Sequence, residues 1–376
     1  MKNIAVIFGG VSCEHDISII TGEQLIDNIS NSNLYNVIPI YIDRNGIWYT
    51  GDLLKDIDNI SNNLTKAKKC SILPNDDYLY MYKFGKYKKF IKLDCVIICM
   101  HGLNGEDGSL SGLFNLNKIA YSSSDLLASS VCMDKTAFKV YCKGLKINVI
   151  DGFSVDKNDY LLHQNDILDD IINFGLPIII KPSRLGSSIG IEICEDEKDL
   201  SMLLEKAFCY DNKVLIERFV NIKKEVNIAL IKNKGEIVYS NTEEPISNDK
   251  ILSFDEKYRK NHGGFQTIKR IVPAEISETQ LNEINDMATK IYNSLGLFGV
   301  VRFDFIIDND NIVYINEVNT IPGSMANYLF NKNTLNYSQL VDTIISNSLH
   351  RKKENNTLKT NVDTGVLQEG ISFIKK

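Results

Sequence analysis

Short apolar runs that end at glycine are the feature that most restricts how this chain can fold. Ile4–Phe8 contains no polar residue and leads directly into Gly9-Gly10. Such a run is typical of a strand buried on both faces in a parallel sheet and followed by a tight turn. Val37–Ile42 and Asp94–Met100 are two more runs of this kind. With a helix expected between the first two runs, residues 1–125 predict a small α/β domain.

Three further regions are expected after this domain. Strand and helix patterns place a central domain over 126–210 and a third domain over 211–350. The best-marked helix covers 278–295, because a Ser-Glu-Thr-Gln capping box opens it and a glycine follows it. The last segment, 351–376, opens with charged residues and predicts a polar, partly disordered tail.

Composition excludes several classes of protein. The net charge of −6 over 376 residues argues against a protein whose main task is to grip nucleic acid. No apolar stretch is long enough for a transmembrane helix, and the first apolar run is too short for a signal peptide, so a cytoplasmic protein is expected. The eight cysteines form no C-x-x-C pair, which favours buried free thiols over zinc ligands or disulfides.

The segment from Val300 to Gly323 carries the strongest functional signal. Apolar residues alternate with Arg302 and Asp304, which predicts a strand with both charges on one face. A turn signal and a second strand, Ile312–Glu317, follow directly. The segment therefore predicts a hairpin.

The pairing of these two strands decides which side chains meet. We expect Ile307 to pair with Ile312 across the turn. In that register Asp304 shares a face with Glu317, with Asn319 and with the arginine two residues before it. Two carboxylates and an amide oxygen suit one or two magnesium ions bound together with phosphate. A solvated face with surface ion pairs is the alternative. A shift of the register by one residue would separate these side chains and contradict the predicted metal site.

Three glycine-containing loops follow predicted strands. The stretch 178–190 passes from a strand into a Gly/Ser loop whose N–H groups and Lys181 could bind phosphate, although it is not a Walker A motif. The loops His101–Gly108 and Gly9–Ser18 lie where α/β folds place ligands, and Glu14 could bind an ammonium group. A plain hairpin turn, an Asx turn and a helix N-cap are the respective alternatives.

Together these segments resemble the D-alanine–D-alanine ligases of the ATP-grasp fold. The resemblance runs from Ile4 to about Ser346 and rests on segments in the family's order, which are IFGGVSCEHDIS, HGLNGEDGSLSG, CMDK, IIIKPSRLGSSIG, FDEKY, VVRFDF and NEVNTIPG. It implies an α/β, three-domain ATP-grasp ligase with a small N-terminal α/β domain. The implied activity is ATP-dependent joining of two D-alanines through an acyl phosphate, for peptidoglycan precursor synthesis.

The resemblance also implies roles for individual residues. The nucleotide would be bound by Lys135, Lys181, Ser188, Glu225 and Lys257, and by the backbone of the segment that contains Glu217, Arg218 and Val220. Two Mg²⁺ or Mn²⁺ ions would be held by Asp304, Glu317 and Asn319. The groups implied to bind the first amino acid and stabilise its reaction are Glu14, Ser187, Tyr258, Arg302 and the backbone N–H of Gly323. Further substrate contacts are implied for His101, Tyr328 and Leu329.

Two positions depart from the family pattern. Tyr328 stands where a small hydroxyl residue is common near the second substrate, and Ser111 stands where glutamine is common. Tyr258 is the residue type associated with an amine acceptor, so D-alanine is expected there, with D-serine as the alternative. A catalytically silent ATP-grasp binding protein is a second alternative. A homodimer through the first domain, with ATP and D-alanine as ligands and no nucleic-acid or membrane partner, is also implied.

Overall fold

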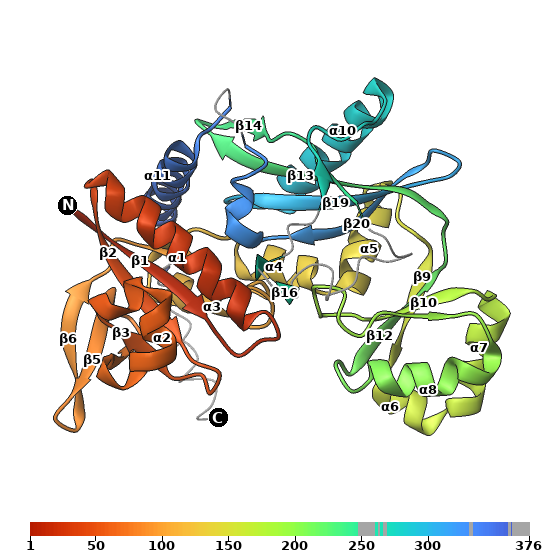
Figure 1. The fold of residues 1–376 in the computed structure, drawn as a ribbon, viewed down its shortest axis with the longest axis horizontal. Coiled ribbons are helices and arrows are strands. Elements are labelled where there is room, and N and C mark those ends of the chain that lie inside the picture. Colours follow the sequence, from red (N-terminus) through yellow and green to blue (C-terminus); the bar gives the residue numbers. More distant parts are fainter. Residues whose placement is uncertain (247–259, 262–263, 266–268, 331–333, 360–361, 363–376) are drawn as a thin grey trace, which may run out of the picture.

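The chain forms three groups of strands and helices, shown in the computed structural model of Figure 1. The structure describes residues 1–246, 260–261, 264–265, 269–330, 334–359 and 362. The N-terminal elements and the central sheet lie at opposite ends of the view, with the C-terminal sheet between them. Within the described part of the chain, no helix is both long and apolar enough to cross a membrane.

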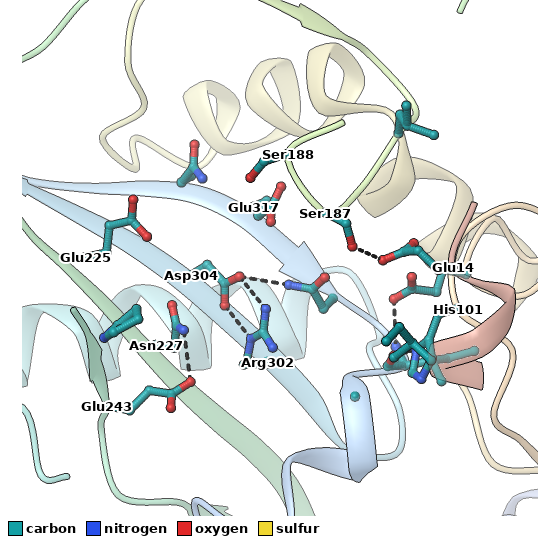
Figure 2. A pocket seen from close by; sticks show the side chains of 18 of the residues that line it. Glu14, His101, Ser187, Ser188, Glu225, Asn227, Glu243, Arg302, Asp304 and Glu317 are labelled. Carbon is teal, nitrogen blue, oxygen red and sulfur yellow. Dashed lines mark hydrogen bonds and ion pairs between the residues drawn. The ribbon is translucent and has the colours of Figure 1, made fainter. Parts of the chain in front are cut away.

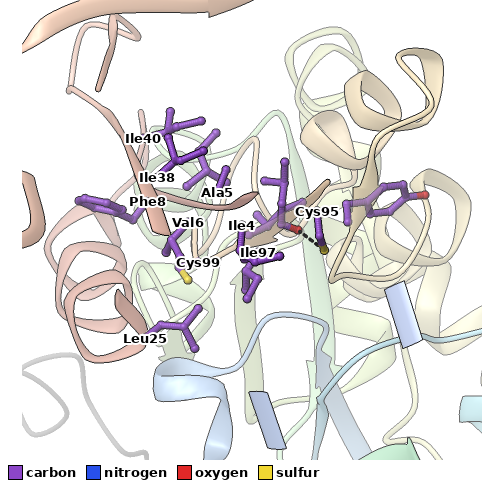
Figure 3. Packing of buried hydrophobic residues seen from close by; sticks show 14 of the residues in the cluster. Ile4, Ala5, Val6, Phe8, Leu25, Ile38, Ile40, Cys95, Ile97 and Cys99 are labelled. Atoms are coloured by element: carbon purple, nitrogen blue, oxygen red, sulfur yellow. Dashed lines mark hydrogen bonds between the residues drawn. The ribbon is translucent and has the colours of Figure 1, made fainter. Parts of the chain in front are cut away.

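The N-terminal region is built on an eight-stranded sheet in the order β6-β5-β4-β3-β2-β1-β7-β8. β1 pairs in parallel with β2 and β7, and β7 with β8, which confirms the predicted buried parallel strands. Figure 3 shows side chains of β1, such as Ile4 and Phe8, packed among those of α1, β2 and β7. The elements are β1 (Lys2–Gly9), α1 (His15–Ser32), β2 (Tyr35–Ile42), β3 (Trp48–Thr50), α2 (Ile57–Asn63), β4 (Lys68–Ile72), β5 (Tyr78–Lys83), β6 (Lys86–Lys92), β7 (Cys95–Ile98), α3 (Ser109–Leu116) and β8 (Ala120–Tyr121), with 3₁₀ turns η1 (Asp52–Lys55) and η2 (Leu64–Lys66).

The central region is an antiparallel sheet in the order β11-β10-β12-β9. Its elements are α4 (Leu126–Met133), α5 (Lys135–Gly144), β9 (Gly152–Asp156), α6 (Lys157–Leu162), α7 (Gln164–Phe174), β10 (Ile178–Pro182), β11 (Glu192–Cys194), α8 (Glu197–Ala207) and β12 (Lys213–Arg218). Helices α7 and α8 cover this sheet, whereas α4 and α5 do not. Cys132 and Phe138 of α4 and α5 instead pack in one apolar core with Phe303 and Phe305 of the C-terminal sheet. The first part of the segment expected to form the central domain is therefore packed with the third.

The C-terminal region is a second antiparallel sheet, in the order β14-β13-β19-β20. Its elements are β13 (Ile222–Asn233), β14 (Glu236–Tyr239), β15 (Glu244–Pro245), β16 (Lys260–Asn261), β17 (Gly264–Phe265), β18 (Arg270–Ile271), α10 (Glu278–Ser294), β19 (Val301–Asp308), β20 (Val313–Asn319), the 3₁₀ turn η3 (Gly323–Ala326) and α11 (Tyr337–Asn355). The predicted capping box of α10 is present, because Ser277 and Gln280 bond each other's backbone N–H groups. That helix is confirmed to within a residue at its end.

The predicted hairpin is present, but its expected register is wrong at the turn. Ile307 lies opposite Val313 rather than Ile312. A β-bulge then shifts the register by one more residue, so that Asp304 lies opposite Glu317. The two offsets add to an even number, and side chains alternate with a period of two. The predicted face therefore survives, with its charges gathered on one side.

The expected polar tail begins later than residue 351. Helix α11 continues to Asn355, and the guanidinium of Arg351 lies 4.2 Å from the ring centroid of Tyr121 and 3.7 Å from that of Phe298. It also donates to the carbonyls of Ser123 and Tyr121 at 3.0 and 2.7 Å. Arg351, at the start of this segment, thus joins α11 to the N-terminal region. The polarity of the local sequence does not reveal this contact.

The cysteines agree with the predicted free thiols. All eight are free, and six are buried, with Cys13 and Cys209 exposed. Burial raises the pKa of the Cys70 and Cys95 thiols to about 12. Such thiols are packing residues rather than nucleophiles.

Candidate active site

A cavity of about 650 Å³ lies between the central and C-terminal sheets and extends to the loops after β1 and β7 (Figure 2). The residues expected in a site that line it are Glu14, His101, Lys135, Lys181, Ser187, Ser188, Val220, Glu225, Arg302, Asp304, Glu317, Asn319, Gly323 and Tyr328. Three expected residues, Glu217, Arg218 and Leu329, do not line it. Lys257 and Tyr258 lie outside the described residues.

The charged face of the β19–β20 hairpin forms one wall of the cavity. Arg302 donates from Nε and Nη2 to the two carboxylate oxygens of Asp304, at 2.7 Å each. Asn319 donates from Nδ2 to Asp304 Oδ2 at 3.0 Å. Burial would lower the pKa of Arg302, but the adjacent carboxylate outweighs burial and holds it well above its usual value. The arginine is therefore a permanent cation in a fixed orientation.

Lys135, at the start of α5, joins this wall to the phosphate-binding loop expected after β10. Its ammonium donates to the carbonyl of Leu185 at 2.7 Å and lies 3.5 Å from Glu317 Oε2. Its own backbone N–H donates to Ser183. The lysine is thus held at the meeting point of the two sheets, beside the carboxylate expected to bind metal.

The Gly/Ser loop reaches across to the N-terminal region. Ser187 and Ser188 both have positive φ, 56° and 58°, an unusual conformation for residues other than glycine. Ser187 donates from its hydroxyl to Glu14 Oε1, and Figure 2 shows the two side chains pointing toward each other. A Cβ on Gly186 would lie 3.1 Å from Glu14 Oε2. This position therefore favours glycine, and the loop brings a carboxylate from before α1 to the cavity.

His101 belongs to a buried hydrogen-bond chain. Its Nδ1 lies 2.7 Å from the carbonyl of Ile321, so this nitrogen donates. Burial lowers the pKa of His101, and the neutral ring can then accept at Nε2 from the hydroxyl of Thr21, 2.9 Å away. The hydroxyl of Thr21 in turn accepts from the backbone N–H of Ser324 at 3.1 Å. The histidine thus joins α1 to the turn η3.

Glu106 is a cavity residue that the sequence reasoning passed over as part of a turn. Its carboxylate accepts from the backbone N–H groups of Gly102 at 2.9 Å and Ile321 at 3.3 Å. Burial, together with the nearby Glu14 carboxylate, raises the pKa of this carboxyl to about 8. The available signal was its place directly after a buried strand, in the loop of His101.

In the segment 217–220, which is expected to contact the nucleotide base, only Val220 lines the cavity. Glu217 is fully buried and contacts the ammonium groups of Lys139 and Lys181. Arg218 stacks on Phe174, 4.3 Å from the ring centroid, and points away from the cavity. Neither side chain faces the cavity, so a contact of this segment with the nucleotide would have to come from its backbone, as the resemblance implies.

Tyr328 belongs to a polar cluster that the sequence did not reveal. Its hydroxyl donates to Glu243 Oε1 at 3.1 Å, and the guanidinium of Arg270 lies 4.5 Å from its ring centroid. Asn227 also donates to Glu243 Oε1, at 3.0 Å. Burial raises the pKa of Tyr328 to about 12, so its hydroxyl stays protonated. The neighbouring Leu329 is a core residue with no exposed surface.

These features define the class of the protein. Two antiparallel sheets enclose one polar cavity, and the first supplies Lys181 while the second supplies Asp304 and Glu317. This is the arrangement of an ATP-grasp enzyme. The family sequence models described as D-ala D-ala ligase N-terminus and C-terminus match residues 3–124 and 141–346. The chain belongs to the D-alanine–D-alanine ligase family.

Individual relatives agree over almost the whole chain. The chain is 35% identical over 372 residues to the D-alanine–D-alanine ligase of Thermosipho melanesiensis, covering 98% of this chain and 99% of that one. It is 33% identical over 359 residues to that of Clostridium acetobutylicum, with 92% and 97% covered. Among solved structures, the VanG D-Ala:D-Ser ligase from Enterococcus faecalis is similar at a TM-score of 0.77 and 28% identity, with 92% and 99% covered. The D-Alanine-D-Alanine Ligase from Helicobacter pylori has a TM-score of 0.73 and 29% identity, with 94% and 98% covered.

Proposed function

We propose that this chain joins two D-alanine molecules to D-alanyl-D-alanine at the expense of ATP, supplying a peptidoglycan precursor. One observation carries the proposal: a single cavity holds the Glu14–Ser187 pair, two lysines, and the Arg302–Asp304 pair. These are the groups needed to bind an amino acid, a polyphosphate and a developing oxyanion. The names of the relatives, which match over nearly their full lengths, support the same reaction.

The nucleotide would lie between the two sheets. Lys135 and Lys181 would neutralise its phosphates, the loop at Ser188 would bind phosphate oxygens, and the backbone at Val220 would contact the base. Glu225 lies in the same cavity on β13, where it can accept from the ribose hydroxyls. Fixed charges of this kind supply most of the stabilisation in phosphoryl transfer.

Magnesium, one or two ions (or manganese), would be held by Asp304, Glu317 and Asn319. Carboxylate and amide oxygens are the ligands that such hard cations prefer. In the described part of the chain no group of three histidine, cysteine or carboxylate side chains converges, so phosphate oxygens and water would supply the remaining ligands. When bound, the metal would neutralise charge on the transferred phosphoryl group.

The reaction would proceed in two steps. Glu14, oriented by Ser187, would bind the ammonium group of the first D-alanine, whose carboxylate oxygen attacks the γ-phosphorus of ATP to give an acyl phosphate and ADP. The free amine of the second D-alanine then attacks the carbonyl carbon. Arg302 and the N–H of Gly323 would stabilise the resulting oxyanion, and its collapse expels phosphate while the amine loses a proton.

D-Serine is the alternative acceptor. Tyr328 and Glu243 form a polar wall in the cavity, which could bond a substrate hydroxyl. A solved relative of similar fold is titled a D-Ala:D-Ser ligase. A catalytically silent binding protein is disfavoured because Arg302 and Asp304 are both present and paired.

We also propose a cytoplasmic homodimer that associates through the N-terminal region. This rests on the family resemblance. Light scattering coupled to size-exclusion chromatography tests it: a mass near twice 42.5 kDa supports the dimer, and a mass near 42.5 kDa contradicts it.

The activity is tested by ATP-dependent phosphate release with D-alanine, D-serine, D-lactate and L-alanine, alone and in pairs, with each product identified by mass. Release with D-alanine alone, giving the dipeptide, is the expected result. Release only with D-alanine and D-serine together would change the acceptor and keep the mechanism. Binding of ATP without release from any combination would favour the silent protein.

A further inference from the structure

A buried ion triplet lies directly behind the nucleotide side of the cavity. Glu217 on β12 has no exposed surface, and its two carboxylate oxygens contact different lysines. Oε1 contacts Lys139 on α5, and Oε2 contacts Lys181 on β10. Lys139 also donates to the carbonyl of Ile150 at 3.1 Å. Of the three charged groups, Lys181 lines the cavity, whereas Lys139 and Glu217 do not.

We propose that Lys139 is a positioning residue for the nucleotide site, acting through Lys181: by neutralising Glu217, it leaves the charge of Lys181 available to the phosphates of ATP. The inference rests on the proposed function only in taking a nucleotide as the ligand of this cavity. No contact between Lys139 and the ligand is required.

The argument follows from counting buried charges. A carboxylate with no exposed surface needs a cation beside it, since an unpaired buried charge is strongly destabilising. If Lys181 were the sole partner, the pair would be neutral, and any movement of Lys181 toward a phosphate would strand Glu217. Burial lowers the pKa of Lys139, and the adjacent Glu217 carboxylate opposes that effect. As an ammonium ion Lys139 supplies the second cation, so the triplet carries one net positive charge. Burial raises the pKa of Glu217, but the two lysines outweigh burial and lower it, which keeps the carboxylate ionised.

Lys181 has room to respond to a ligand on the cavity side. Its ammonium lies 3.5 Å from Asn316 Oδ1 on the opposite sheet, in addition to its contact with Glu217. Lys139 is buried to a similar extent, 5% exposed against 7% for Lys181, but it does not line the cavity. The two lysines therefore differ in role: one faces the ligand, and the other faces the carboxylate from behind.

A purely structural role is the competing reading, because Lys139 also ties α5 to β12. Net charge separates the two readings. The triplet carries +1 in the native chain, 0 in Lys139→Met, +2 in Glu217→Gln and +1 again in the double variant. The tie between α5 and β12 stays lost when both partners are removed, whereas a charge effect on the ligand is reversed.

The experiment titrates magnesium–ADP into the full-length protein by calorimetry. Lys139→Met should weaken binding about tenfold, on the order of one charge–charge interaction at an effective dielectric constant of about 20. Adding Glu217→Gln to that variant should restore binding to within about threefold of the native chain. Lys143→Met is the matched control: Lys143 lies one turn further along α5, is exposed, and pairs with Asp151, so its loss should leave binding unchanged.

Native-like binding by Lys139→Met overturns the proposal, and so does a double variant at least as weak as Lys139→Met. If Lys139→Met fails to fold, Glu217→Gln alone decides, because tighter binding supports the charge effect and weaker binding contradicts it. ADP binding without ligase activity in the native chain would refute the proposed reaction and leave this comparison intact. Absence of ADP binding by the native chain would refute both.

Discussion

The two ends of the cavity differ in charge: lysines line the nucleotide end, whereas burial favours neutral groups at the end beside the N-terminal region. At the nucleotide end, the ammonium groups of Lys135 and Lys181 contact carbonyl, amide or carboxylate oxygens. At the end beside the N-terminal region, burial lowers the pKa of His101 and raises that of Glu106 to about 8, which favours the neutral form of both. Fixed cations suit a polyphosphate. A small zwitterion is better held by one carboxylate, Glu14, among neutral neighbours, because no other charge then competes for its ammonium group.

The largest effect on turnover is expected from Arg302, which is assigned to the oxyanion and belongs to neither end of the cavity. Arg302→Ala should lower kcat by about 10³-fold, because it removes a preorganised donor to the oxyanion. ADP affinity should stay within about threefold, as measured by calorimetry. Arg302→Lys keeps the charge but not the two-pronged bond to Asp304, and should recover only part of the rate. An equal loss of ADP affinity and turnover would count against this role.

A matched pair of serine variants should separate the two ends. Ser187→Ala removes a donor to Glu14 and should raise the KM for D-alanine roughly 10- to 100-fold, the range for a hydrogen bond to a charged group. Its effect on the KM for ATP should be small. Ser188→Ala, on the same loop, should show the reverse pattern. Steady-state kinetics with each substrate varied measures both KM values. Identical changes in the two variants would contradict the assignment of Ser187 to D-alanine and of Ser188 to ATP.

The neutral end should impose a pH dependence on stability. Folded Glu106 keeps its proton up to a pKa of about 8, whereas the unfolded chain releases it near 4.5. The folded state then binds more protons across this window, so its contribution to stability falls as pH rises from about 4.5 to 8. Relative to Glu106→Gln, the native chain should therefore lose a few degrees of Tm over that range.

Thermal unfolding at a series of pH values measures this difference. Glu236→Gln, at an exposed position on β14, is the control and should run parallel to the native chain. A constant offset between the native chain and Glu106→Gln would show that Glu106 does not titrate in this window.

The smallest effect is expected far from the cavity. Ser277→Ala removes the N-cap of α10 and should cost about 1 kcal/mol of stability, measured by denaturant unfolding. Ser277→Asp keeps a capping oxygen and should retain most of it. Neither substitution should alter the affinity for ADP or the KM for either substrate. A change in any of these values would show that the stability of α10 affects the cavity.

Local patterns predicted a large share of the fold. The run Ile4–Phe8 indicated a buried parallel strand, and the capping box at Ser277 indicated where α10 begins. Even the face of the β19–β20 hairpin was correct, although the bulge beside Asp304 was not predicted. A bulge depends on how the strands meet their neighbours, whereas alternation depends only on the parity of the spacing.

The site itself was predicted unevenly. The side chains of Glu217 and Arg218, in the segment whose backbone is expected to contact the nucleotide, do not line the cavity, and the buried ion contacts of Glu217 had no local signal. Glu106 and Glu243 were not singled out, since a carboxylate in a turn or a short strand has no local signature of burial. Arg351 was assigned to a tail, yet it packs against rings contributed by residues 121 and 298.

Spacing and order along the chain predicted the class of fold, the family resemblance and fourteen of the residues that line the cavity. Tertiary structure alone decided which of those residues are charged, which are neutral and which are buried behind the wall. His101 hydrogen-bonds to Ile321, 220 positions away, and Lys139 on α5 contacts Glu217 on β12. Such contacts set local solvation, and solvation decides whether a titratable group keeps its charge.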